Sequence, residues 1–135
     1  MKVEIKYPKQ ELYAVVTGVD IKSISKTDFD DLFKTVNLYG VTVIKDQKIN
    51  DEEQIKFSKK FGSLEISIGT NTKKENNPYI KPEISRISNV DIVSNKMLPS
   101  GDHKIIFDRG NNVWHTDSSF KSIPSKYSIL SGREI

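Results

Sequence analysis

The feature that most constrains the fold is an amphipathic helix pattern that passes directly into a run of β-branched residues. Four apolar residues recur at the spacing of one helix face: Phe29, Leu32, Phe33 and Val36. Thr27 is the predicted N-cap of this helix, with Asp30 three residues later, and Gly40 is its predicted end. Because residues 41–44 are Val-Thr-Val-Ile, we predict a short buried strand immediately after the helix. The chain therefore combines helices and strands in one fold.

A second helix and several further strands are predicted from similar signals. Asn50 and Glu53 have the spacing of a capping box, and Gly62 is the predicted end of a helix whose apolar face includes Phe57. The predicted strands are rich in β-branched or alternating apolar residues and cover 11–21, 83–93, 113–120 and 127–130. Residues 66–82 are polar with Gly and Pro, which is typical of a loop, and 98–102 form a turn. We predict a mixed α/β fold with a mainly β core and its helices in the first half.

Composition excludes several function classes. The net charge of +3 comes from lysines scattered among acids, so no basic block indicates nucleic-acid binding. The 135 residues contain no cysteine, which excludes disulfides and restricts any metal site to His, Asp or Glu ligands. No segment has the apolar length of a membrane-spanning helix, and the N-terminus lacks the apolar core of a signal peptide. We therefore expect a cytoplasmic protein that does not bind membranes.

The run from Trp114 to Phe120 contains a His-x-Asp pair. On an extended strand alternate side chains face the same way, so His115 and Asp117 are predicted to point to one side, with Cα atoms roughly 6.6 Å apart. An imidazole and a carboxylate so placed are two members of the 2-His-1-carboxylate set that holds non-haem Fe(II). An isolated His-x-Asp pair is common, however, and a purely structural role is the alternative. We interpret Trp114 and Phe120 as core residues.

Other polar residues near this pair have weaker claims to a function. His103 is the only other histidine, and we interpret it as a solvated loop residue or one that lies near a substrate. Asn111 either faces a substrate group or forms a local turn. Ser118 and Ser119 are not expected to be nucleophiles, because alternate-facing neighbours on one strand do not form a Ser/His/Asp triad.

Two stretches, in this order and spacing, carry a resemblance to a known family. The first is Leu-Tyr-Gly-Val-Thr-Val-Ile-Lys-Asp-Gln at 38–47, followed by Asn-Asp-Glu-Glu-Gln at 50–54 and Phe-Gly-Ser-Leu-Glu at 61–65. The second is Trp-His-Thr-Asp-Ser-Ser-Phe at 114–120, with Tyr-Ser-Ile-Leu-Ser at 127–131 beyond it. The chain resembles the TauD/TfdA family of Fe(II)- and 2-oxoglutarate-dependent dioxygenases from about residue 15 onward. Its second stretch is more similar to the 2,4-dichlorophenoxyacetate dioxygenase branch than to the taurine branch.

The resemblance implies a double-stranded β-helix, the jelly-roll of clavaminate synthase-like proteins, of which residues 1–135 are the N-terminal part within a single domain. It implies that His115 and Asp117 are ligands of Fe(II), that 2-oxoglutarate and molecular oxygen are co-substrates, and that Asn111 binds the substrate. The implied reaction is hydroxylation of a small anionic organic acid, such as an aryloxyalkanoate or a sulfonate. Retention of Asp117 favours hydroxylation over halogenation, because halogenating relatives leave that coordination position open. The residues that bind 2-oxoglutarate stay unknown.

The family's distal histidine and its co-substrate arginine have no counterpart in these 135 residues. Two protein ligands hold Fe(II) weakly, so we expect this chain alone to be an inactive fragment of such a dioxygenase. One alternative is a catalytically dead remnant that acts as a binding or assembly module. Another is an unrelated metal- or sugar-binding β-protein in which His115 and Asp117 are structural. An incomplete jelly-roll leaves strand edges unpaired, which favours a homo-oligomer or a complementing C-terminal chain.

Overall fold

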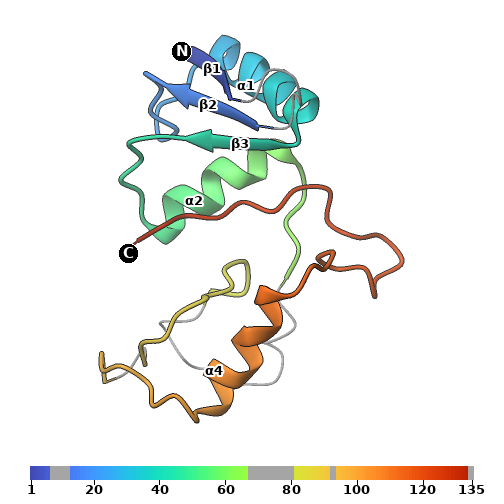
Figure 1. Cartoon of the computed structure of the whole chain (residues 1–135). Coiled ribbons are helices and arrows are strands. Elements are labelled where there is room, and N and C mark those ends of the chain that lie inside the picture. The colour runs from blue at the N-terminus through green and yellow to red at the C-terminus, as the bar shows by residue number, and fades with distance from the viewer. Residues whose placement is uncertain (7–12, 67–80, 92–93, 134–135) are drawn as a thin grey trace. The chain divides into compact units, whose positions relative to one another are not determined.

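The computed structural model describes residues 1–6, 13–66, 81–91 and 94–133, apart from the side chains of residues 3–6 and 111. The chain divides into two compact units, Met1–Gly62 and Ser63–Ile135, which are taken separately below (Figure 1). The helices and strands are concentrated in the first unit: β1 (Lys2–Lys6), β2 (Tyr13–Thr17), α1 (Lys26–Tyr39), β3 (Val41–Ile44), α2 (Asp51–Ser58) and the 3-10 helix η1 (Lys59–Phe61). The second unit contains α4 (His103–Asp108) and the 3-10 helix η2 (Arg109–Asn112).

A three-stranded sheet organises the first unit. Its order is β1-β2-β3, with β1 antiparallel and β3 parallel to the central strand. Val16 of β2 lies opposite Ile44 of β3, and the chain between these two parallel strands passes through α1 (Figure 1). Such a crossover is what parallel pairing requires. Ala14, Val15 and Val16 of this central strand are all buried.

The predicted first helix is confirmed, but its predicted cap is wrong. Ser25, not Thr27, is the N-cap: its backbone is extended and its side-chain oxygen accepts a hydrogen bond from the Asp28 amide at 3.0 Å. Thr27 already lies inside the first turn, where its backbone is helical. The helix ends at Gly40 as predicted, where φ is +64°, a value that favours glycine.

The predicted capping box at the start of α2 is confirmed. The Asn50 side chain accepts from the Glu53 amide at 2.9 Å, and the Glu53 carboxylate accepts from the Asn50 amide at 2.8 Å. The α-helical part stops at Ser58, and one turn of 3-10 helix carries the chain to Gly62, where φ is +142°. The two reciprocal bonds satisfy donors that a helix start would otherwise leave unpaired.

The core of the first unit joins the sheet to both helices. Val16, Ile21, Leu32 and Phe57 form its buried centre, and Leu32 is fully buried. Aromatic rings surround this centre: Phe61 lies 5.2 Å from Phe29 and 5.5 Å from Phe57, each pair edge to face. Each such pair contributes about 0.5–1.5 kcal/mol beyond the area it buries. Of the predicted apolar stripe of α1, Leu32 is therefore buried and Phe29 and Val36 pack against the core, whereas Phe33 is 36% exposed.

The second unit departs from the predicted strands. Of the described residues in 83–93, 113–120 and 127–130, Val90 alone makes a β-bridge, to Met97. Residues 117–120 form a turn instead, and Ser118 has φ +58°. The alternation of apolar residues was misleading, because a strand also needs a partner with which to exchange backbone hydrogen bonds. The predicted turn at 98–102 is confirmed by a bond from the Asp102 amide to the Pro99 carbonyl at 2.9 Å.

A short helix occupies the place where a loop around His103 was predicted. Asp102 caps α4 by accepting from the Lys104 amide at 2.8 Å. Lys104 then pairs with Asp108 at 3.0 Å and donates to the Ser88 carbonyl. The interpretation of Trp114 and Phe120 as core residues is wrong, since the Trp114 side chain is fully exposed and Phe120 is 70% exposed.

Other predictions fall partly or wholly outside the described residues. These are most of the loop at 66–82, the first two residues of the strand at 11–21 and the end of the strand at 83–93. In the part of the chain that the structure describes, no helix combines the length and the apolar character needed to cross a bilayer.

Candidate metal site

His115 and Asp117 converge in the second unit, in the irregular segment that follows η2. The His115 Nε2 atom lies 3.2 Å from the Asp117 Oδ1 atom, and both side chains are about half exposed. The structure therefore brings the two predicted ligands together, although a turn at 117–120 and not a regular strand does so.

The orientation of the His115 ring is fixed by the backbone. Its Nδ1 atom lies 2.7 Å from the carbonyl oxygen of Val113. Since a carbonyl oxygen can only accept, Nδ1 carries the hydrogen, and in the neutral ring Nε2 then has a lone pair. That lone pair faces the Asp117 Oδ1 atom, so a cation placed between the two atoms would be bound by both.

The spacing of the pair fits a shared metal ion. Nitrogen and oxygen ligands lie about 2.1 Å from a small divalent metal ion, so two adjacent ligands at a right angle are about 3.0 Å apart. The observed separation of 3.2 Å is close to this value. A carbonyl acceptor on the other ring nitrogen is also the usual partner of a metal-binding histidine.

Asp117 is oriented by a second contact that leaves one oxygen available. Its Oδ2 atom accepts a hydrogen bond from the Ser128 hydroxyl at 2.6 Å, while Oδ1 faces His115. Ser128 lies eleven residues further along the chain, so this bond also holds the following segment against the turn. The arrangement has the form of an outer partner that fixes the direction of a ligand.

Next to Asp117, the turn is fastened to Glu65. The Ser118 hydroxyl lies 2.9 Å from Glu65 Oε1 and 2.8 Å from Oε2. Lys121 pairs with Oε1 at 2.6 Å, and the Ser125 hydroxyl donates to Oε2. The Lys121 hydrogen bond, followed by those of Ser125 and Ser118, lowers the pKa of Glu65 from 4.5 to about 2. The Glu65 carboxylate is therefore ionised at neutral and at mildly acidic pH.

Of the other predicted site residues, His103 does not join the pair. His103 is exposed at the first position of α4. Asn111 lies within η2, but its side chain is outside the described part, so its role in substrate binding stays a prediction. Among the described residues, no group of three or more His, Asp or Glu side chains is placed to hold a metal ion. Within the described structure, the predicted site therefore consists of His115 and Asp117 alone.

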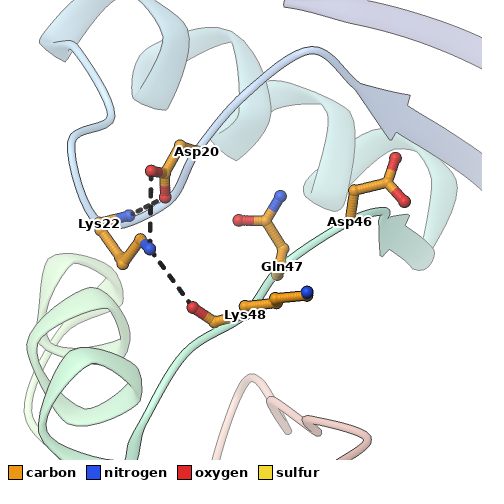
Figure 2. A pocket seen from close by; sticks show the side chains of 5 residues that line it. All are labelled: Asp20, Lys22, Asp46, Gln47 and Lys48. Carbon is orange, nitrogen blue, oxygen red and sulfur yellow. Dashed lines mark hydrogen bonds and ion pairs between the residues drawn. The ribbon is translucent and has the colours of Figure 1, made fainter.

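A hollow in the first unit is structural, although polar side chains line it. Figure 2 shows its lining, which consists of Asp20, Lys22, Asp46, Gln47 and Lys48. The Gln47 amide is engaged by the backbone: Oε1 accepts from the Ile21 amide at 3.0 Å, and Nε2 donates to the Val19 carbonyl at 2.7 Å. Gln47 therefore joins the turn after β2 to the turn after β3, which explains a glutamine at this place without any ligand.

Comparison with known proteins identifies the family. Residues 4–135 match the model of the taurine catabolism dioxygenase TauD, TfdA family. The chain belongs to this family. It is 28% identical over 127 residues to the alpha-ketoglutarate-dependent 2,4-dichlorophenoxyacetate dioxygenase of Cupriavidus pinatubonensis, covering 92% of this chain and 43% of that protein. It is 30% identical over 110 residues to the protein of the same name from a Burkholderia species, covering 81% of this chain and 36% of that protein.

A third relative and a solved structure support the same assignment. The (S)-phenoxypropionate/alpha-ketoglutarate-dioxygenase of Sphingobium herbicidovorans is 28% identical over 123 residues, with 90% of this chain and 37% of the relative covered. The crystal structure of AAD-2 in complex with Mn(II) and N-oxalylglycine matches with a TM-score of 0.75 and 25% identity, covering 93% of this chain and 40% of that chain. This TauD/TfdA chain has a mixed helix and strand architecture that matches part of the family's jelly-roll fold. It spans about two fifths of the length of the relatives it matches.

Two residues of this TauD/TfdA chain that make contacts around the pair were given no role by the sequence. Glu65 ends the Phe-Gly-Ser-Leu-Glu stretch, and Ser128 lies in the Tyr-Ser-Ile-Leu-Ser stretch. Both stretches are among those that carry the family resemblance, and this resemblance was the one signal that could have drawn attention to the two residues. Their partners lie 53 and 11 residues away, and no local spacing rule predicts such contacts.

Proposed function

We propose that this chain contributes His115 and Asp117 as two ligands of Fe(II) in a 2-oxoglutarate-dependent dioxygenase. The observation that supports this most strongly is the 3.2 Å approach of Nε2 to Oδ1, with the opposite ring nitrogen bonded to the Val113 carbonyl. Family membership supports the same chemistry, because the relatives are named as alpha-ketoglutarate-dependent dioxygenases.

The residues of the chain have distinct tasks in this proposal. The metal, with 2-oxoglutarate and oxygen, supplies the oxidising chemistry when bound. His115 presents Nε2 because Val113 holds the other ring nitrogen, and Asp117 presents Oδ1 because Ser128 holds the other oxygen. Both side chains are about half exposed, so small co-substrates can approach the pair.

The proposed substrate is a small anionic organic acid that becomes hydroxylated. An aryloxyalkanoate is favoured over a sulfonate, because three relatives carry aryloxyalkanoate names at 28–30% identity. Asn111 is proposed to contact this substrate, since it precedes the metal pair in the segment that enters the site.

A polypeptide of residues 1–135 alone is proposed to bind the metal weakly and to turn over little or no substrate. The described residues provide two ligands, where this type of site uses two histidines and one carboxylate. We propose that 1–135 form the N-terminal part of a single dioxygenase domain, with a further ligand supplied by additional polypeptide.

Metal binding is tested by titrating the isotope-labelled 135-residue chain with Mn(II) and recording amide NMR spectra. Paramagnetic broadening should be strongest at residues 113–118 and should disappear from there in His115→Ala and in Asp117→Asn. His103→Ala is the matched control and should retain the broadening, because His103 belongs to α4 and not to the pair. Broadening at 113–118 that persists in His115→Ala would refute the assignment of the ligands.

Turnover is tested on the gene product as its own cells make it, with Fe(II), oxygen and 2-oxoglutarate. We expect succinate to form faster with 2,4-dichlorophenoxyacetate than with taurine. A preference for taurine would contradict the proposed substrate class. Succinate formation that is independent of Fe(II) would contradict the proposed chemistry.

A further inference from the structure

We propose that Glu65 is a positioning residue for the metal pair, which it serves by holding the turn that directly follows Asp117. This inference rests on the proposed function, because it takes His115 and Asp117 as metal ligands. It adds a role for a carboxylate that does not touch the metal ligands themselves.

The first step is that Glu65 fastens both ends of one turn. The turn from Ser118 to Lys121 is closed by a hydrogen bond from the Lys121 amide to the Ser118 carbonyl at 2.9 Å. The Ser118 hydroxyl reaches both carboxylate oxygens of Glu65, at 2.9 and 2.8 Å. The Lys121 ammonium reaches Oε1 at 2.6 Å. A single side chain from the start of the second unit thus fixes the first and the last residue of the turn.

The second step is that this turn adopts a conformation that needs support. Ser118 has φ +58°, in the left-handed region that residues with a Cβ atom rarely occupy. Such a conformation persists when surrounding contacts determine it. Ser118 makes the supporting contact with its own side chain, because its hydroxyl donates to the Glu65 carboxylate.

The third step links the turn to the metal pair. Asp117 immediately precedes Ser118, so the backbone angles of Ser118 set the path that leads from the carboxylate ligand into the following segment. That segment returns through Ser125, which also donates to Glu65, to Ser128, which donates to Asp117 Oδ2. The anchor on Glu65 therefore controls both the backbone beside Asp117 and the approach of its side-chain partner.

The charge of Glu65 is suited to this task. Its three partners are all donors, and one of them is a cation, so the ionised form is the one they stabilise. The lowered pKa, about 2, agrees with this. The side chain of Glu65 is about 29% exposed and that of Lys121 about 30%, so the group is partly shielded from competing water.

The test compares Mn(II) affinity, measured by the same NMR titration on the 135-residue chain, between the native protein and Glu65→Gln. Substitution of a residue that supports a metal ligand typically weakens affinity by about 10–100-fold. Because Glu65 acts through the turn and not directly on a ligand, we expect a dissociation constant about 3–10-fold higher. Glu83→Gln is the matched control: it is an exposed glutamate of the same unit that makes no hydrogen bond or ion pair with another described residue.

A merely structural role is distinguished by the apo spectrum and by a double-mutant cycle. In Glu65→Gln the apo amide shifts outside 63–66 and 113–128 should be unchanged. Ser118→Ala should weaken Mn(II) binding by a similar factor, and the double variant should be little worse than either single one, because both substitutions remove the same contact. If Glu65→Gln does not fold, Ser118→Ala and Lys121→Met test the proposal in its place. Each should raise the Mn(II) dissociation constant.

The outcomes separate the two proposals. If His115→Ala leaves Mn(II) binding at 113–118 unchanged, the proposed function fails. If His115→Ala abolishes that binding while Glu65→Gln and Ser118→Ala change it less than 1.5-fold, the proposed function stands and the role of Glu65 is refuted. Full additivity of the two substitutions in the double variant would also refute the proposed mechanism.

Discussion

Replacing Gln47 tests whether one amide joins two turns of the first unit. The side chain makes three hydrogen bonds to the backbone: from the Ile21 amide at 3.0 Å, and to the carbonyls of Val19 at 2.7 Å and Lys45 at 2.6 Å. Gln47→Ala removes all three while leaving α1 and α2 intact. The amide of Ile21 and the carbonyl of Val19 are then left without these partners.

The expected loss follows from the burial of these groups. A hydrogen bond of this kind contributes about 0.5–1.5 kcal/mol net, and more is lost when a buried partner is left unsatisfied. The bonds to Ile21 and Val19 are partly buried, whereas the bond to Lys45 is exposed and water can replace it. We therefore expect Gln47→Ala to reduce the free energy of unfolding by about 2 kcal/mol. Gln47→Glu should lose at least as much at neutral pH, because a carboxylate then faces two carbonyl oxygens.

Urea unfolding followed by circular dichroism at 222 nm measures this loss. With an m-value of about 1–2 kcal/mol/M, the midpoint should fall by about 1–2 M while m stays the same. Asp46→Asn is the matched control, since it alters an exposed neighbour with φ +60°, which asparagine tolerates, and should change stability by less than about 0.5 kcal/mol. A Gln47→Ala protein as stable as this control would refute the reasoning.

Three further predictions concern caps, charge and the ligand's partner. Asn50→Ala should lower the free energy of unfolding by about 1 kcal/mol, because it breaks the capping box with Glu53, and an unchanged urea midpoint would contradict this. The carboxyl carbon of Glu65 should titrate near pH 2 by NMR. Because its folded pKa lies below the ordinary 4.5, its stabilising contribution is complete above pH 4.5 and is lost as the pH falls towards 2; a midpoint near 4.5 would argue against the contact with Lys121. Ser128→Ala should raise the Mn(II) dissociation constant about 10-fold without changing the apo fold, and an unaltered constant would show that Asp117 needs no such partner.

Local signals predicted the helices of the first unit well, but the strand predicted to be buried at 41–44 has Val41 50% and Val43 38% exposed. The capping box at Asn50 and the helix end at Gly40 depend on residues close together in sequence. A local sequence pattern is therefore sufficient to predict them. The cap of α1 was missed because Ser25 and Thr27 both carry a hydroxyl, and the choice depends on which backbone is extended. The signal for α4 was present in Asp102, a good N-cap directly before a helix that starts at His103.

The second unit shows where sequence patterns are insufficient. Alternating apolar residues predicted strands around Ile87 and Ile129, but strand formation depends on partners that the pattern does not specify. The convergence of His115 and Asp117 was predicted from strand alternation, and the structure reaches it through a turn with Ser118 at φ +58°. The predicted convergence of the two side chains is therefore confirmed and the predicted strand is wrong, while their assignment as metal ligands stays a prediction. Long-range contacts such as that of Glu65 lay beyond any local rule.

The most direct test of the central claim is pulsed EPR on the Mn(II)-loaded chain, which detects nitrogen nuclei bound to the metal. The chain has two histidines, so the source of any imidazole coupling can be assigned by substitution. We predict coupling to one imidazole nitrogen, retained in His103→Ala and lost in His115→Ala. Coupling that persists in His115→Ala, or no nitrogen coupling in the native chain, would contradict the assignment of His115 as a metal ligand.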